Sequence, residues 1–237
     1  MSDAQLTMTL VIPVYNEASF LPGALERLYD DLAQVEAAVD VILAENGSTD
    51  GTAELGRELG QKYPDLQVIE LPDPDYGGAM RAGFLAARGD WVFNSDNDYF
   101  SGSFMAKVAA MADEADEVLA SKRDPESDDR RSPVRRLATW TFNQVLRFML
   151  GSKVSDTHGI KALRREVIAD VAEAVISRQD LFDTELVIRA EKKGWRIREL
   201  PIVVEEQRET KSSLLKRIPR TLRGVWRIRK AMRVSSS

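Results

Sequence analysis

Two aspartates separated by one residue, Asp96 and Asp98, form the pair whose type and spacing most directly suggest chemistry. Carboxylate oxygens are hard ligands for Mg²⁺ and Mn²⁺, and these ions commonly share their coordination sphere with substrate phosphates. Asp-x-Asp pairs also occur in ordinary solvated turns, so the spacing alone says little. The pair follows a short apolar run, Trp91–Asn94, which we interpret as a buried strand, and this position favours a metal site.

Polar residues also follow two earlier apolar runs. A strand predicted over Met8–Val14 is followed by Tyr15–Glu17, and a strand predicted over Val39–Ala44 is followed by Glu45–Asp50. Strands and helices alternate at short intervals through the first part of the chain, which is typical of a doubly wound, mostly parallel sheet flanked by helices. Ligands bind beyond the carboxyl ends of such strands, so the three polar clusters are expected to line one crevice.

The remaining elements are predicted from apolar periodicity and from residues that start or stop helices. Further strands are expected over Leu66–Glu70, Glu117–Ser121 and Trp195–Val204. Helices are expected over Ala18–Val35, Thr52–Tyr63, Gly77–Arg88, Ser103–Glu114, Pro133–Leu150, Arg164–Ile176 and Asp183–Lys193, the last closed by Gly194. Ser155–Ala162 is expected to be irregular, and Gly83 is expected to allow close packing of a helix on the sheet.

Composition excludes several kinds of chemistry. The chain of 237 residues has no cysteine, so it has neither disulfides nor thiolate chemistry. Its single histidine, His158, excludes a site built from several histidines. No apolar run is long enough to span a membrane, and the N-terminus lacks the pattern of a signal peptide. A location in the cytoplasm, or peripheral on the cytoplasmic membrane face, is expected.

The charge is unevenly distributed along the chain. The net charge is −5, yet Lys211–Ser237 contains nine Lys or Arg and no acidic residue. A basic amphipathic helix is predicted over Leu214–Arg233, and its apolar stripe suits either a membrane interface or the protein body. Trp226 is the only aromatic residue of this tail, which is too few for a stacking platform, so no nucleic-acid partner is expected.

Six motifs occur in an order that resembles a known family. They are VIPVYNE (Val11–Glu17), ENGSTDGT (Glu45–Thr52), YGGAMRAGFLAARGD (Tyr76–Asp90), SDND (Ser95–Asp98), DTHGIKALRRE (Asp156–Glu166) and LFDTELVIRAEKKGWRIRELPI (Leu181–Ile202). Together they resemble family 2 of the inverting glycosyltransferases, which have the GT-A fold, and within it the polyprenyl-phosphate (dolichyl-phosphate) mannose and glucose synthases. The resemblance extends from Thr9 to about Leu222.

The resemblance implies a role for each matching residue. The nucleotide-sugar donor would contact Pro13, Tyr15, Glu17, Glu45, Asn46, Gly77, Asp96, Asn97, Asp98, Arg208 and Lys211. Asp96 and Asp98 would hold Mg²⁺ or Mn²⁺ on the diphosphate, Asp98 and Asp156 would be catalytic, and Arg123 and His158 would contact the acceptor. The chain departs from the family at Glu45 and Asn46, where aspartates are usual, and at Phe100, where some members have a glutamine ligand.

The implied reaction is a metal-dependent, inverting transfer of a hexose from a GDP-mannose or UDP-glucose type donor to polyprenyl or dolichyl phosphate. One alternative acceptor is a soluble or polysaccharide hydroxyl, for which Asp156 would accept the proton. An inactive nucleotide-sugar-binding protein is a second alternative. A nucleotidyltransferase is disfavoured, because no Gly-x-Gly-x-x-Arg sequence follows the first strand.

The same resemblance predicts the domain organisation. A GT-A domain is expected over residues 1–208, with a nucleotide-binding half (8–100) and an acceptor half (101–208). The basic C-terminal loop and amphipathic helix would occupy residues 209–237 and supply a peripheral membrane contact.

Overall fold

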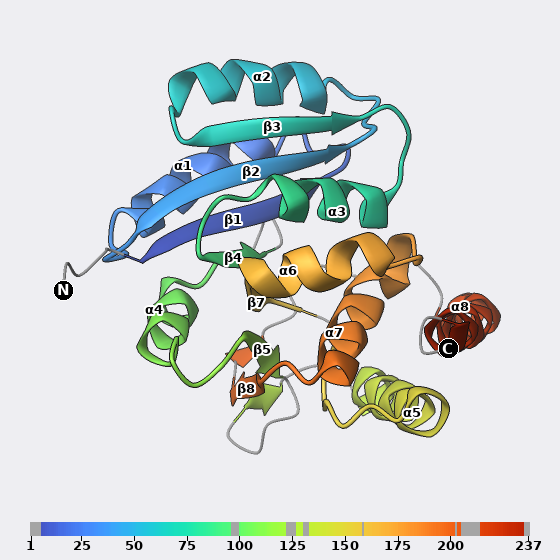
Figure 1. The fold of residues 1–237 in the computed structure, drawn as a ribbon. Helices are drawn as coiled ribbons and strands as arrows, with labels where there is room; N and C mark the ends of the chain where they lie inside the picture. Colours follow the sequence, from blue (N-terminus) through green and yellow to red (C-terminus); the bar gives the residue numbers. More distant parts are fainter. Residues whose placement is uncertain are drawn as a thin grey trace.

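A seven-stranded sheet with helices on both faces forms the centre of the protein (Figure 1). The structure is a computed structural model, and it describes residues 6–95, 100–121, 127–129, 133–157, 159–201, 203–204 and 214–234. The strand order is β3-β2-β1-β4-β7-β5-β8. Every neighbouring pair is parallel except those made by β7, which runs antiparallel to both β4 and β5. The doubly wound, mostly parallel sheet expected from the sequence is confirmed.

The elements have the following bounds. The strands of the sheet are β1 (Thr7–Val14), β2 (Ala38–Asn46), β3 (Leu66–Leu71), β4 (Trp91–Asn94), β5 (Glu117–Ser121), β7 (Lys161–Arg164) and β8 (Ile197–Pro201), and a separate parallel pair consists of β6 (Asp128–Asp129) and β9 (Val203–Val204). The helices are α1 (Leu21–Leu32), α2 (Thr52–Lys62), α3 (Tyr76–Ala86), α4 (Gly102–Ala110), α5 (Pro133–Leu150), α6 (Arg165–Val171), α7 (Phe182–Lys193) and α8 (Leu214–Val234), with short 3₁₀ turns η1 (Ala172–Ala174) and η2 (Gln179–Leu181).

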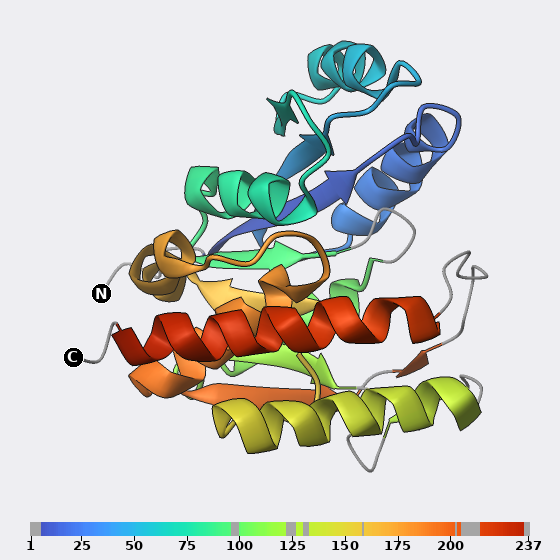
Figure 2. The ribbon, with the colours of Figure 1, turned by 90° about the vertical axis from the view of Figure 1, so that its right-hand side faces the viewer.

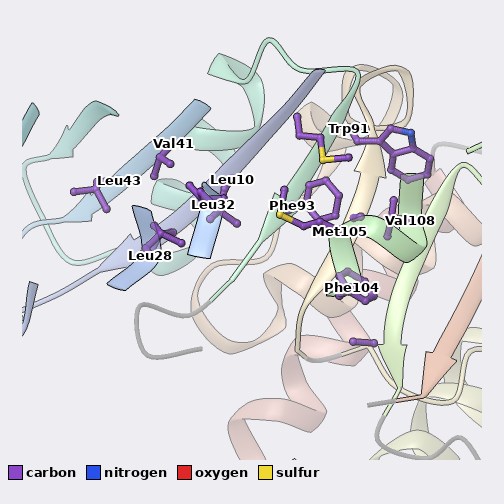
Figure 3. Close-up of a cluster of buried hydrophobic side chains, with 14 of the residues drawn as sticks. Leu10, Leu28, Leu32, Val41, Leu43, Trp91, Phe93, Phe104, Met105 and Val108 are labelled. Atoms are coloured by element: carbon purple, nitrogen blue, oxygen red, sulfur yellow. The ribbon is translucent and has the colours of Figure 1, made fainter. Parts of the chain in front are cut away.

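Alternating side chains of the strands supply two separate cores. On one face, Leu10 of β1 and Phe93 of β4 pack against α1 and α4, as Figure 3 shows. On the other face, Val11 and Val92 pack against α3, α6 and α7. Both faces of the central strands are covered, which explains why their sequences are continuous apolar runs rather than alternating ones.

The helix expected over Arg164–Ile176 is shorter than predicted, because Arg164 ends β7 and a 3₁₀ turn follows α6 after Val171. Two further segments differ from the expectation in their type of structure or pairing. Ser155–Ala162 was expected to be irregular, but its last two residues begin β7, which lies between β4 and β5. This strand is short and starts with a lysine, so its sequence lacks the apolar signal of its neighbours. The strand expected over Trp195–Val204 is two strands: β8 pairs with β5 in the main sheet, whereas β9 pairs with β6.

The amphipathic C-terminal helix packs against the body of the protein. Val225 and Ile228 of α8 are fully buried in a small cluster with Leu146 of α5 and Ile188 of α7. Pro219 lies inside α8, whose first residue is Leu214. In the described part of the chain, no helix combines the length and apolar character needed to cross a membrane. At least part of the apolar stripe of the tail is therefore used for packing.

Gly83 allows α3 to approach β1 closely, as expected. A Cβ atom added at Gly83 would lie 2.5 Å from Cγ1 of Val11, at the centre of the sheet. We predict that Gly83→Ala lowers the free energy of unfolding by about 1–3 kcal/mol, because the helix or the strand must shift. Urea denaturation followed by circular dichroism measures the change.

Gly56 of α2 supplies a matched control. Its added Cβ would lie 3.5 Å from Val68, an ordinary contact. Gly56→Ala should raise the stability by about 0.5–1 kcal/mol through helix propensity. If both variants changed stability in the same direction, close packing at Gly83 would not be the cause.

Candidate active site

The loops that follow β1 and β2 are joined by side-chain hydrogen bonds. The backbone N–H of Asn16 donates to Ser48 Oγ (2.9 Å), and Asn16 Oδ1 accepts from the backbone N–H of Thr49 (2.8 Å). The backbone N–H of Glu17 donates to Thr52 Oγ1 (2.9 Å). Val14 of β1 lies opposite Glu45 of β2, so the two strands end side by side. Two of the three expected polar clusters therefore form one connected surface where the parallel strands end, which we call the carboxyl edge.

Glu45 and Asn46 bind backbone groups of the loops around them. The Glu45 carboxylate is buried and accepts from the N–H groups of Ser48 (2.6 Å) and Gly47 (3.2 Å). Asn46 Oδ1 accepts from the N–H of Asp75 (2.5 Å), just before α3. The two departures from the family's aspartates are thus accommodated by loops that use the longer carboxylate and the amide.

The other described residues expected to contact a donor surround these loops. Tyr15 is exposed, and Pro13 and Glu17 are half-buried at the end of β1. Gly77 is buried in the first turn of α3, where an added Cβ would lie 3.0 Å from both Ser177 O and Arg178 Cα. The chain itself occupies the space beside Gly77, so this glycine permits the 177–178 segment to pack on α3.

β4, the strand that precedes the aspartate pair in the sequence, ends at the same edge. β4 ends at Asn94, and the backbone N–H of Ser95 continues the pairing with Val11 O (3.2 Å). Seven expected site residues lie outside the described residues: Asp96, Asn97, Asp98, Arg123, His158, Arg208 and Lys211. Within the described ranges, no group of three or more His, Cys, Asp or Glu could hold a metal ion. Phe100 packs against the core cluster of α1 and α4.

Asp156 approaches the carboxyl edge from the other half of the sheet. β7 is antiparallel, and Lys161, its first residue, lies opposite Asn94, the last residue of β4. The segment that leads into β7 consequently arrives at the edge where β4 ends. Asp156 lies in this segment and is only 3% exposed. Its neighbour Thr157 is hydrogen-bonded to Thr184 of α7 (3.0 Å between the hydroxyl oxygens).

A buried ionic network beside this edge was not anticipated from the sequence. Lys161 is 1% exposed, and its Nζ donates to Asp183 Oδ1 (2.8 Å) and to Gly159 O (2.9 Å). The backbone N–H of Lys161 donates to Asn94 Oδ1 (2.9 Å). The hydroxyl of Tyr76 donates to Asp183 Oδ2 (2.7 Å). Lys161 and Asp183 fall inside two of the family motifs, which is the only signal the sequence offers, because charged residues are ordinarily assigned to the surface.

Removing one partner of this network leaves the other charge buried. We predict that Lys161→Met destabilises the protein by about 3–5 kcal/mol, because the Asp183 carboxylate loses its cation. Lys193→Met is the control, since its salt bridge with Asp170 (2.5 Å) is exposed and worth about 0–1 kcal/mol. Chemical denaturation measures both. Equal effects of the two substitutions would contradict a dominant role for the buried pair.

Glu117 is a second buried ionisable residue on the same face of the sheet. Burial raises the pKa of Glu117 to about 8, while Lys161 lowers it and Glu191 raises it further. Among the described residues, neither carboxylate oxygen has a hydrogen-bond partner. In the unfolded chain the pKa is about 4.3. Between the two pKa values, the folded protein therefore binds one proton more than the unfolded chain. This proton stabilises the folded state fully below about pH 4, and the stabilisation is lost as the pH rises through 8.

Glu117→Gln should remove this pH dependence. Relative to the native sequence, the variant should gain about 3 kcal/mol of stability between pH 5.5 and pH 8.5, because glutamine remains neutral. The free energy of unfolding of both proteins, measured at both pH values, gives this difference, in which the contributions of other groups cancel. A difference that is constant with pH would show that Glu117 has an ordinary pKa in the folded protein.

Comparisons with known proteins agree with this architecture. The profile described as "Glycosyl transferase family 2" matches residues 9–172. Polyprenol monophosphomannose synthase of Mycolicibacterium smegmatis is 30% identical over 84% of this chain and 77% of its own length. Undecaprenyl-phosphate mannosyltransferase of Micrococcus luteus is 29% identical over 83% of each chain.

Two solved structures are similar in fold. A mannosyltransferase from Pyrobaculum calidifontis, in complex with GDP-Man and Mn²⁺, superposes with a TM-score of 0.66 at 20% identity, covering 98% of this chain and 65% of that one. Glucosyl-3-phosphoglycerate synthase from Mycobacterium tuberculosis, in complex with Mn²⁺, UDP and glucosyl-3-phosphoglycerate, gives a TM-score of 0.64 at 20% identity, covering 94% and 78%.

The sheet, its helical layers and the loops at the carboxyl edge define a GT-A glycosyltransferase fold. The chain belongs to glycosyl transferase family 2.

Proposed function

We propose that the protein transfers a hexose from a nucleotide-diphosphate sugar to a polyprenyl phosphate, with inversion at the anomeric carbon. The observation that carries this proposal is that both halves of the sheet contribute segments to the carboxyl edge. There the β1 and β2 loops, the end of β4 and the segment containing Asp156 come together. The relatives named for polyprenol and undecaprenyl phosphate support a lipid phosphate as the acceptor.

The donor would bind across the nucleotide-binding half, residues 8–100. Tyr15 is exposed beside the bonded loops and can pack on the base. Pro13, Glu17, Glu45, Asn46 and Gly77 would shape the subsite through the loops they hold. Arg208 and Lys211 would reach the diphosphate from the polypeptide between β9 and α8.

A divalent metal fits the donors that the chain presents after β4. Asp96 and Asp98 would hold Mg²⁺ or Mn²⁺, and Asn97 would line the same turn, because hard carboxylate oxygens suit these ions. When bound, such an ion neutralises charge that develops on the leaving diphosphate. The mannosyltransferase and the synthase described above were both solved with Mn²⁺.

The acceptor would bind through the second half, residues 101–208. A lipid phosphate is already an anionic nucleophile, so it needs little help from a general base. Asp156, which is almost fully buried, would then orient the reacting groups and exclude water. Arg123 and His158 would contact the acceptor phosphate, and Asp98 would act at the reacting centre through the diphosphate.

A soluble acceptor is the second candidate. The synthase solved with UDP and glucosyl-3-phosphoglycerate shares the fold, and its name points to a small phosphorylated compound as the sugar acceptor. With a hydroxyl acceptor, Asp156 would accept the proton as the new glycosidic bond forms. An enzyme of this kind would transfer sugar equally well with and without lipid.

Donor binding tests the proposed site directly. We predict that one of GDP-mannose, UDP-glucose, UDP-GlcNAc or UDP-galactose binds in calorimetry only when Mn²⁺ is present. Asp96→Ala/Asp98→Ala should weaken this binding at least a hundredfold, because the diphosphate loses its counter-ion. Asp30→Ala/Asp31→Ala is the matched control, since these two acids lie at the far end of α1.

Transfer of the identified sugar to undecaprenyl phosphate, compared with transfer to 3-phosphoglycerate, then distinguishes the two acceptors. The absence of donor binding with any metal would reject the proposed site. Transfer to 3-phosphoglycerate alone would reject the lipid acceptor but retain the donor site.

A further inference from the structure

Two helices form an outer layer on one side of the molecule. α5 and α8 contact each other and together cover α7 and η2, and Figure 2 shows them running along the same side. Leu146 and Leu150 of α5, and Val225 and Ile228 of α8, are buried beneath this layer. The outward sides of both helices face away from these buried residues.

The outward side of α5 is apolar. Val134, Leu137, Trp140 and Phe148 are exposed by 67%, 62%, 47% and 87%. At ~100° per residue these four side chains fall within about one third of the helix circumference. The buried residues Asn143, Leu146 and Leu150 lie on the opposite side. Single exposed apolar residues are common, but a stripe of four with two aromatic rings is a typical interaction surface.

The outward side of α8 continues this character. Leu222 and Trp226 are 42% and 57% exposed and lie one helical turn apart. Lys230 Nζ lies 5.9 Å from the centre of the Trp226 ring, so the indole is flanked by a cation. The two helices thus expose three large aromatic side chains: Trp140, Phe148 and Trp226.

The charge of the two helices has a single sign. α5 and α8 together contain eleven Lys or Arg and no Asp or Glu, in a chain whose net charge is −5. Exposed cations on the two helices include Arg136, Arg147, Arg223, Arg227 and Lys230. An anionic partner is therefore favoured. Exposed indole and phenyl rings interleaved with cations match the headgroup region of a bilayer, where tryptophan and basic amphipathic helices are stable.

We propose that the exposed sides of α5 and α8 form a docking surface for a bilayer that contains anionic lipid. We call this surface, made by Val134, Leu137, Trp140, Phe148, Leu222 and Trp226 with the surrounding Arg and Lys, the docking face. The docking face includes α5, which the sequence analysis did not assign to a membrane contact. It also leaves Val225 and Ile228 of α8 buried against the protein body. Its purpose rests on the proposed function, because a polyprenyl phosphate resides in a membrane.

Vesicle sedimentation tests this surface with the full chain. The protein should bind vesicles of phosphatidylcholine with 30% phosphatidylglycerol and bind pure phosphatidylcholine at least tenfold more weakly.

Trp140→Ser/Phe148→Ser should reduce binding to the anionic vesicles roughly tenfold or more. Arg223→Ser/Arg227→Ser should reduce binding mainly at low salt, because the headgroup attraction is screened. Leu85→Ser/Ile176→Ser, which removes two apolar side chains exposed by 46% and 42% elsewhere, should leave binding unchanged.

Two further readouts separate docking from folding and from catalysis. Thermal unfolding of Phe148→Ser alone should match the native sequence, since this side chain is 87% exposed. Donor binding measured by calorimetry without vesicles should be unchanged in every docking-face variant. Loss of vesicle binding with intact donor binding supports the docking face. Native-like vesicle binding by Trp140→Ser/Phe148→Ser, or an equal loss in the Leu85→Ser/Ile176→Ser control, would overturn it, whatever the fate of the donor site.

Discussion

The buried ion pair between Lys161 and Asp183 is the interaction on which the geometry of the site depends. Lys161 begins β7, and its backbone N–H is bonded to Asn94 where β4 ends. Asp183 lies in the first turn of α7 and also accepts from Tyr76, the first residue of α3. Opposite charges in an apolar interior must remain paired, so four elements are held together at one point. Loops that leave these elements have fixed starting positions at the carboxyl edge.

The antiparallel orientation of β7 has a functional consequence. In a purely parallel sheet, every segment that reaches the carboxyl edge leaves a strand. Here one segment arrives at that edge instead, because β7 begins where β4 ends. Asp156 belongs to this arriving segment, whereas the loops proposed to bind the donor leave β1 and β2. A donor bound on one half of the sheet would thereby face acceptor residues supplied by the other half.

The sequence predicts the strands of the first half well, because apolar runs such as Met8–Val14 are buried on both faces and have few alternative structures. It fails at β7, whose four residues include Lys161 and Arg164 and whose place in the sheet is set by distant partners. The polar loops could be located from the motifs. The hydrogen bonds within these loops could not be predicted, because the bonds from the Gly47 and Ser48 amides to Glu45 depend on the folded backbone.

The separation of charge between α5 and α8 and the rest of the chain affects how the protein approaches a charged surface, before the two touch. All eleven ionic groups of α5 and α8 are positive, whereas the remaining chain has a large excess of carboxylates. A particle of this kind has a strong permanent electric dipole. Near a negatively charged surface it experiences a torque that turns the acidic body away and the two helices inward. The enzyme would therefore arrive already oriented, and fewer of its encounters with such a surface would be unproductive.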